Sequence, residues 1–284
     1  MILIEITVEN YKGEKTYIAP SQDFFLLNID GLTPPNATLN TSILAFGDGA
    51  RINSSRVEAR EILITLKPRM PMELNRKKLY RYFQIKKSVR LFFKTSYSDV
   101  YIDGIVKSVE ADLFSKNQKV VISIFCENPY FKGIKENRII MAQADGLFEF
   151  PFSIQESGKE FSVVDSIQTV NVINNGDVEN GIQIELEANG QVINPIIYEK
   201  FSKCAMSFNI TLEEAEVLLI NTKQNEKNVF LKKNAEKINV IDTLNDGSGW
   251  FTLLTGDNLF SYSAESGAEN LTVTLIHNDY YGGI

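Results

Sequence analysis

The chain contains a single histidine, His277, and this limits the acid-base chemistry that it can perform. A Ser-His-Asp triad would have to use this residue, with Asp279 as the group that orients the ring. The motif G-x-S-x-G, which presents a nucleophilic serine on a sharp turn, does not accompany it. Because His277 belongs to the alternating segment 271–279, we interpret it as a residue at the end of a strand.

Metal and phosphate sites find little support in the sequence. The two cysteines, Cys126 and Cys204, are too few for a disulfide framework or a cysteine-based zinc site. Oxygen ligands that suit calcium gather at 174–177 and 242–246, but neither segment has the EF-hand spacing, and both are typical of Asx turns. The phosphate-binding motifs G-x-x-x-x-G-K-[ST] and G-x-G-x-x-G do not occur. We therefore expect no metal and no cofactor.

Two kinds of carbohydrate chemistry stay open. The 36 acidic residues leave room for the carboxylate pair of a glycosidase. Trp250, the only tryptophan, offers an aromatic face for a sugar ring, although a core position at the start of a strand is favoured. Without a catalytic motif, we rank a non-enzymatic assembly protein first. A monomeric carbohydrate-binding module or adhesin comes second, and a β-sandwich glycoside hydrolase third.

Positive charge is concentrated between Lys67 and Lys94, where ten basic residues stand beside one acid, Glu73. A helix is predicted over 71–83, with Pro71 as its first residue, because proline has no N–H to lose there. Aromatic residues interleave with the basic ones, as in some nucleic-acid-binding proteins. However, apolar residues are needed to seat the helix on a sheet, and no nucleic-acid-binding motif is present. A solvated or subunit-facing basic surface is therefore favoured.

Length and charge indicate two domains. The chain has 284 residues, and residues 1–139 carry 21 Lys and Arg against 15 Asp and Glu, whereas residues 140–284 carry 8 against 21. The N-terminal residues reach Glu5 before an apolar segment of a secretion signal forms, and no stretch is apolar enough to span a membrane. We expect the chain to fold in a reducing cytoplasm.

The element pattern predicts a mainly β protein. The first domain, residues 1–135, reads as an α+β sandwich or barrel with one helix, and its alternating segments lie at 2–8, 24–29, 57–66, 88–94, 99–109 and 118–126. Turn-forming residues dominate a long arm or hairpin at 33–55. A connector at 136–162 leads to a second domain at 163–284. Its short strands, separated by Asn, Gly and Asp turns, predict an antiparallel β-sandwich.

Several short strings, in their order and spacing, resemble the distal tail protein family of long-tailed phages and related phage-tail-like particles. In the N-terminal half these are Gly47–Ala50, Ser54–Ile62, Asn75–Phe83, Glu127–Phe131 and the connector string Phe148–Phe152. In the C-terminal half they are Asn175–Asp177, Gly181, Gly190, Asn194–Pro195, Ile241–Thr243, Trp250 and Leu254–Asn258. Where the family has Leu-Pro-Gly, this chain has Leu254-Thr255-Gly256, which keeps the turn glycine.

The resemblance implies a tail-tip assembly protein. Its N-terminal domain would form a homohexameric ring that continues the tail tube and joins the tail-associated hub protein, and the arm would clasp the neighbouring subunit. The C-terminal domain would be a galectin-like or carbohydrate-binding-like sandwich that supports receptor-binding proteins. The expected location is the virion tail tip, after synthesis in the bacterial cytoplasm, with no membrane and with DNA only as passing cargo.

The same resemblance assigns candidate contact residues. Those for the arm and the ring interface are Asp48, Arg51, Arg56, Arg76, Lys77 and Arg81. The candidate for a glycan or partner contact is Trp250. In a ring, the basic segment 67–94 would face an acidic partner or the lumen through which DNA passes.

Overall fold

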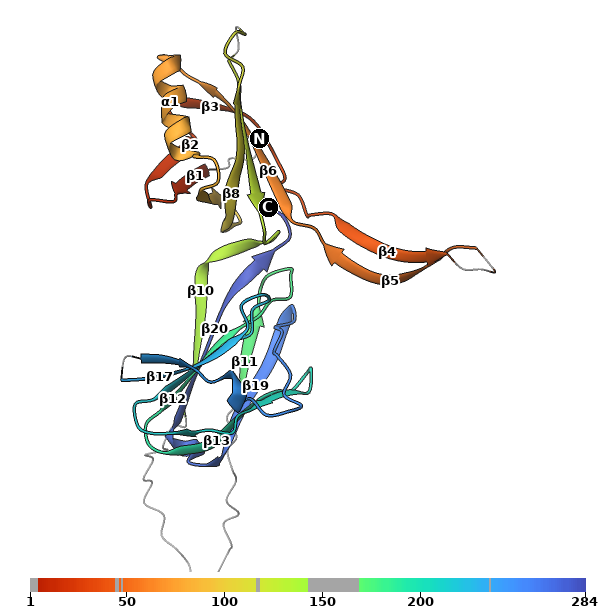
Figure 1. Ribbon diagram of the computed structural model, residues 1–284, viewed down its shortest axis with the longest axis vertical. Coiled ribbons are helices and arrows are strands. Elements are labelled where there is room, and N and C mark those ends of the chain that lie inside the picture. Colours follow the sequence, from red (N-terminus) through yellow and green to blue (C-terminus); the bar gives the residue numbers. More distant parts are fainter. Residues whose placement is uncertain (1–4, 44–45, 47, 116–117, 143–168, 235) are drawn as a thin grey trace, which may run out of the picture. The chain divides into compact units, whose positions relative to one another are not determined.

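The computed structural model describes residues 5–43, 46, 48–115, 118–142, 169–234 and 236–284. Within these residues the protein is built mainly from antiparallel strands, with one α-helix, so the predicted mainly β fold is confirmed (Figure 1). The chain divides into two compact units. Unit 1 comprises Met1–Lys135 and Asp279–Ile284, and unit 2 comprises Glu136–Asn278.

Unit 1 contains nine complete strands and the helix among its described residues. They are β1 (Glu5–Asn10), β2 (Lys15–Ala19), β3 (Phe24–Asp30), β4 (Ala37–Ile43), β5 (Ala50–Val57), β6 (Arg60–Pro68), α1 (Met72–Tyr82), β7 (Ser88–Lys94), β8 (Asp99–Ala111) and β9 (Val120–Cys126). The strand β10 (Phe131–Ala142) begins in unit 1 and continues into unit 2.

Seven strands of unit 1 form one antiparallel sheet in the order β2-β1-β7-β8-β9-β6-β3. Alternate residues are buried along β1, β6, β7 and β9, as in β6, where Ile62, Ile64 and Leu66 have no exposed surface. This period of two places one face of each of these strands in a common core, to which β2 and β3 each add one buried residue. The helix α1 packs against β6 and β1 and adds Leu79 and Phe83 to that core (Figure 1).

The helix α1 departs from its predicted pattern at two positions. Pro71 precedes the helix at the N-cap instead of forming its first turn. Asn75, a polar residue, is buried together with Leu79. Its Nδ2 donates a 3.1 Å hydrogen bond to the Arg69 carbonyl oxygen. That bond satisfies the amide group inside the core, which is what allows a polar residue to occupy the apolar face. Glu73 in the first turn and Arg81 in the last turn complement the helix dipole.

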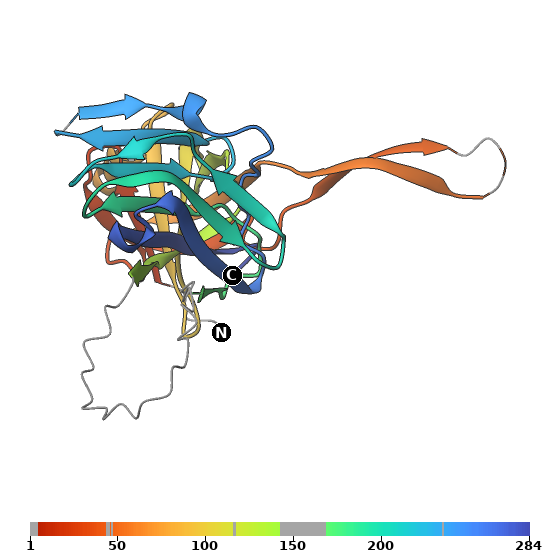
Figure 2. The same cartoon turned by 90° about the horizontal axis from the view of Figure 1, so that it is seen from below.

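Strands β4 and β5 form a separate two-stranded ribbon, which we call the arm. They pair only with each other, from Ala37 opposite Val57 to Ile43 opposite Ala50. In Figures 1 and 2 the arm, drawn in orange, leaves the other strands of unit 1. The segment predicted as an arm or hairpin at 33–55 therefore contains a paired ribbon, whose register shifts between Asn40 and Thr41 and which ends at Val57.

Unit 2 is an antiparallel β-sandwich. Its strands are the end of β10, β11 (Thr169–Asn174), β12 (Gln183–Ala188), β13 (Val192–Glu199), β14 (Cys204–Ser207), β15 (Thr211–Leu212), β16 (Val217–Asn221), β17 (Asn228–Lys233), β18 (Glu236–Asn239), β19 (Gly256–Ser266) and β20 (Leu271–Tyr281), whose last three residues belong to unit 1. One sheet contains β18-β17-β16-β12-β20, and the other contains β11-β19-β13-β14 with β15 beside β13. Apolar residues of both sheets form one core, with Phe251 and Phe260 in edge-on contact.

The structure differs from the predicted organisation in three places. Residues 136–142, expected in a connector, belong to β10, because Met141 is a core residue of unit 2. The last six residues, expected in the second domain, belong to unit 1, where the amide of Ile284 donates to the Leu32 carbonyl oxygen. Strand β2 was not predicted at all.

The connector string Phe148–Phe152 lies outside the described residues. Among the described residues, no helix is both long and apolar enough to cross a membrane.

Candidate functional site

Every residue of β4 and β5 is exposed, so the arm has two free faces. The pairing of the strands places directly opposite residues on the same face. One face is apolar or small and consists of Ala37, Leu39, Thr41, Ile43, Ala50, Ile52, Ser55 and Val57. The other is polar and basic and consists of Thr38, Asn40, Ser42, Arg51, Ser54 and Arg56. An isolated two-stranded hairpin is only marginally stable in water, so an exposed apolar face indicates a surface that a partner covers.

Arg60, the first residue of β6, holds the root of the arm. Its Nη1 donates to the carbonyl oxygens of Gly31 at 2.5 Å and Thr33 at 2.9 Å, both on the chain leading into the arm. Its Nε donates to the Pro129 carbonyl at 2.6 Å, and its Nη2 donates to that of Gly282. One side chain therefore joins the start of the arm to two other segments of unit 1.

The environment of Arg60 is an enclosed one. The residue is only 4% exposed, and its guanidinium lies 4.5 Å from the centre of the Phe131 ring. Burial lowers the pKa of Arg60, but an arginine still carries its charge at neutral pH. Sequence reasoning missed this role. A single arginine at the start of an alternating strand looks like a surface residue, and its acceptors are backbone atoms from distant segments.

The basic side chains of α1 mostly contact other groups of the same chain. Lys77 pairs with Glu73 one turn earlier at 3.0 Å, and Arg76 Nη1 lies 3.4 Å from Gln118 Oε1. The segment 67–94 is thus partly neutralised by its own surroundings. The candidates Arg76, Lys77 and Arg81 lie on α1. Arg51 and Arg56 lie on β5 of the arm, and Asp48 lies between β4 and β5, so the two sets belong to separate parts of unit 1.

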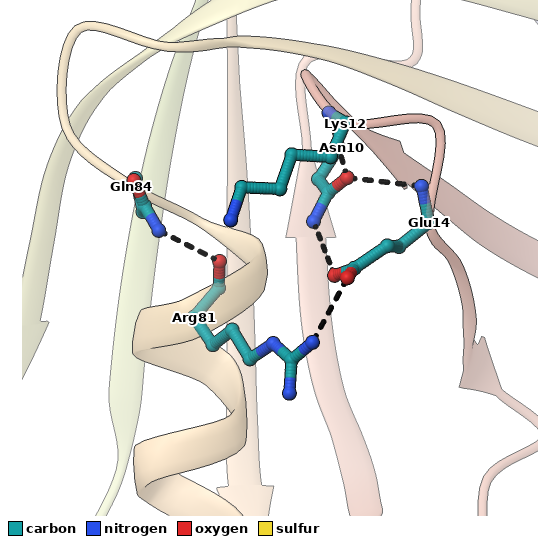
Figure 3. Close-up of polar contacts among 5 residues, drawn as sticks. All are labelled: Asn10, Lys12, Glu14, Arg81 and Gln84. Atoms are coloured by element: carbon teal, nitrogen blue, oxygen red, sulfur yellow. Dashed lines mark hydrogen bonds and ion pairs between the residues drawn. The ribbon is translucent and has the colours of Figure 1, made fainter.

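Arg81 is tied to the turn between β1 and β2 (Figure 3). Its Nη2 donates to Glu14 Oε1 at 2.8 Å, and Asn10 Nδ2 donates to Glu14 Oε2 at 3.0 Å. The Asn10 Oδ1 accepts from the backbone amides of Lys12 and Glu14, which closes the turn. The hydrogen bond from Asn10, followed by that from Arg81, lowers the pKa of Glu14. Arg81 therefore positions α1 against this turn.

The remaining candidates have structural surroundings. Trp250 is partly buried against the core of unit 2, and Lys227 Nζ lies 5.5 Å from the centre of its ring. His277 lies inside β20 and is 1% exposed, so its predicted place at a strand end is wrong. Cys126 and Cys204 are both free thiols, and burial raises the pKa of Cys126 to about 12. Among the described residues, no three His, Cys, Asp or Glu side chains gather as metal ligands would.

By its fold, the protein is a β-rich chain with an exposed, two-stranded arm. No protein-family model and no curated protein matches the sequence.

Solved structures, by contrast, match nearly the whole chain. One match is the crystal structure of the SPP1 Dit protein, described as a paradigm of the hub adsorption apparatus in phages that infect Gram-positive bacteria. It has a TM-score of 0.67 and 10% sequence identity, and the match covers 97% of this chain and 98% of that chain. The phage P2 baseplate in its activated conformation with calcium has a TM-score of 0.51 and 12% identity, over 96% of this chain and 97% of that one. The strontium form of that baseplate gives a TM-score of 0.50, with the same identity and coverage. The chain therefore has the fold of phage hub and baseplate proteins, in agreement with the resemblance seen in its sequence.

Proposed function

We propose that this chain is a distal tail protein, a structural component of the phage tail tip without enzymatic activity. Unit 1 forms a homohexameric ring that joins the tail tube to the hub, and unit 2 supports host-recognition proteins. The observation that carries the proposal is the fold match to the SPP1 Dit protein, which covers nearly the full length of this chain and of that one.

The arm supports the assembly role independently. All fifteen residues of β4 and β5 are exposed, and one face of the ribbon is apolar or small. A surface of this kind in a protein without a partner promotes aggregation, whereas a clasped neighbouring subunit would remove it from water. We keep Arg51 and Arg56, on the polar face of the arm, and Asp48, between its two strands, as candidate interface residues, because a neighbour that clasps the arm would lie beside them. Arg76, Lys77 and Arg81 on α1 also remain proposed interface residues, although each contacts another group of its own chain.

Light scattering over a concentration series tests the proposal in solution. The expected particle contains six copies of the 32.1 kDa chain, at high concentration or after addition of the tail tube protein of the same particle. A ring interface can be weak in isolation, so the experiment must include samples with the tube protein. A mass of one chain under every condition, tube protein included, would contradict the proposal.

A monomeric carbohydrate-binding module is the second candidate. It predicts glycan binding that Trp250→Ala abolishes. Trp250 is partly buried against the core of unit 2 and has Lys227 over its ring, so no observation favours this candidate over the first.

A further inference from the structure

An apolar groove lies at the junction of β3, the end of β6 and the start of α1. Its volume is about 460 Å³, within the range of ligand-sized pockets. The lining residues are Phe25, Leu27, Lys67, Pro68, Arg69, Met70 and Met72. Phe25 is 54% exposed and Met70 is 78% exposed, so the groove presents large apolar side chains to solvent. Methionine side chains adapt their shape readily to a bound group.

The groove carries positive charge beside its apolar surface. The Arg69 guanidinium lies 5.3 Å from the centre of the Phe25 ring, and Lys67 stands directly opposite Phe25 in the sheet. Asp23, the acid next to this region, already accepts from Lys78 Nζ at 2.8 Å. An occupant that suits the groove therefore has an apolar side chain with a carboxylate close to it.

The end of the arm has this composition. Phe46 is 97% exposed and Ile43 is 89% exposed. Between Ile43 and Ala50 the sequence contains one carboxylate, Asp48, and no basic side chain. Phe46 and Asp48 are two residues apart. The arm's own basic residues, Arg51 and Arg56, belong to the polar face of its strands.

We propose that Phe46 and Asp48 of one copy dock into this groove of a second copy, with Phe46 against the apolar lining and Asp48 near Arg69. The inference rests on the proposed ring function and names the surface that receives the arm. No residue of the arm lines the groove of its own chain. Because arm and groove are different surfaces, each copy uses its arm on the next copy and its groove for the previous one. Such head-to-tail contacts close into rings when the rotation between copies allows it.

Photo-crosslinking locates the contact directly. The probe is p-benzoyl-phenylalanine in place of Phe46 in the full chain, irradiated at the concentration at which the native chain associates. Mass spectrometry of the cross-linked product should identify peptides within residues 25–27 and 67–72 of another copy. The same probe in place of Phe114, which is also fully exposed, is the matched control and should not label these peptides. Labelling elsewhere, labelling only within one chain, or no labelling of associated protein would overturn the inference.

Charge exchange provides an independent measurement. Asp48→Arg and Arg69→Glu should each weaken self-association, measured by sedimentation, at least about fivefold, because each creates a like-charge contact. The double variant should return to within about twofold of the native protein. Thermal unfolding of Arg69→Glu checks that the fold is intact. Two single variants whose losses simply add in the double variant would overturn the contact.

The outcomes separate the inference from the function on which it rests. Rings that form normally while Phe46 cross-links outside the groove leave the ring proposal standing and remove this docking surface. A chain that stays monomeric with the tube protein present removes both.

Discussion

Arg60 illustrates how much structure can depend on one side chain. It is buried and donates to four backbone carbonyl oxygens, two of which lead directly into the arm. Carbonyl groups that lose a buried donor are left without hydrogen bonds, which costs more than the bonds themselves contribute. Arg60 therefore sets both the stability of unit 1 and the position of the arm's root.

We expect Arg60→Leu to lower the free energy of unfolding of unit 1 by about 3 kcal/mol, since it leaves several buried acceptors unsatisfied. Urea unfolding monitored by circular dichroism provides the measurement. Arg56→Leu is the matched control, because Arg56 is exposed on the arm, and its effect should stay within about 0.5 kcal/mol. Equal effects of the two variants would contradict the role given to Arg60.

Glu199 performs a similar task in unit 2, where its carboxylate closes the turn between β13 and β14. Burial by itself raises the pKa of Glu199. Hydrogen bonds from Ser202, from the Phe201 amide at 3.1 Å and from the Leu259 amide at 3.2 Å outweigh that effect and hold the pKa below its ordinary value of 4.5. The ionised form is thus favoured in the folded state, and its stabilisation is present above the unfolded-state pKa.

Glu199→Gln should lower the free energy of unfolding by about 1–2 kcal/mol at pH 7, because hydrogen bonds to a charged acceptor are the stronger ones. As the pH falls below 4.5 toward the depressed folded-state pKa, the native protein loses this advantage and the two curves should converge. Urea unfolding at a series of pH values measures this. Glu187→Gln, at an exposed position of β12, is the control and should show no such convergence. A constant difference across the pH range would refute the assignment.

At the scale of elements, the sequence predicted those parts whose side chains alternate strongly. Strands β6, β7, β8 and β9 lie close to their predicted positions, because each buries every second residue in one core. Strand β2 was missed because its five residues bury only Ile18. Strand β10 was missed because the turn string Glu127–Phe131 suggested the end of a domain. The groove was also unpredictable, because it combines residues of three elements that only the fold brings together.

We expect the arm to be required for association of the chains but not for the stability of unit 1. We expect that replacing residues 38–56 by an Asn-Gly turn changes the free energy of unfolding of unit 1 by less than about 1 kcal/mol, because no side chain of β4 or β5 is buried. The same variant should fail to associate in light scattering. Tyr97→Ser, in another exposed loop, is the control and should preserve both properties. An armless chain that still assembles would show that the arm is not the clasp.

For the whole molecule, charge and fold lead to the same interpretation. Unit 1 carries 20 Lys and Arg against 15 Asp and Glu, and unit 2 carries 9 against 21. Two units with opposite net charge suit two different sets of surroundings, which is compatible with the two roles proposed for them. Composition indicated this division and the β-rich class. The candidate interface residues could not be tested in the same way, because in the proposed ring the partner that completes each contact would be a second chain.

Negative-stain electron microscopy of the concentrated protein, alone and with the tail tube protein, tests the proposed ring by direct observation. We predict rings with six-fold symmetry and a central hole. Single particles of one chain at every concentration, with the tube protein present as well, would contradict it.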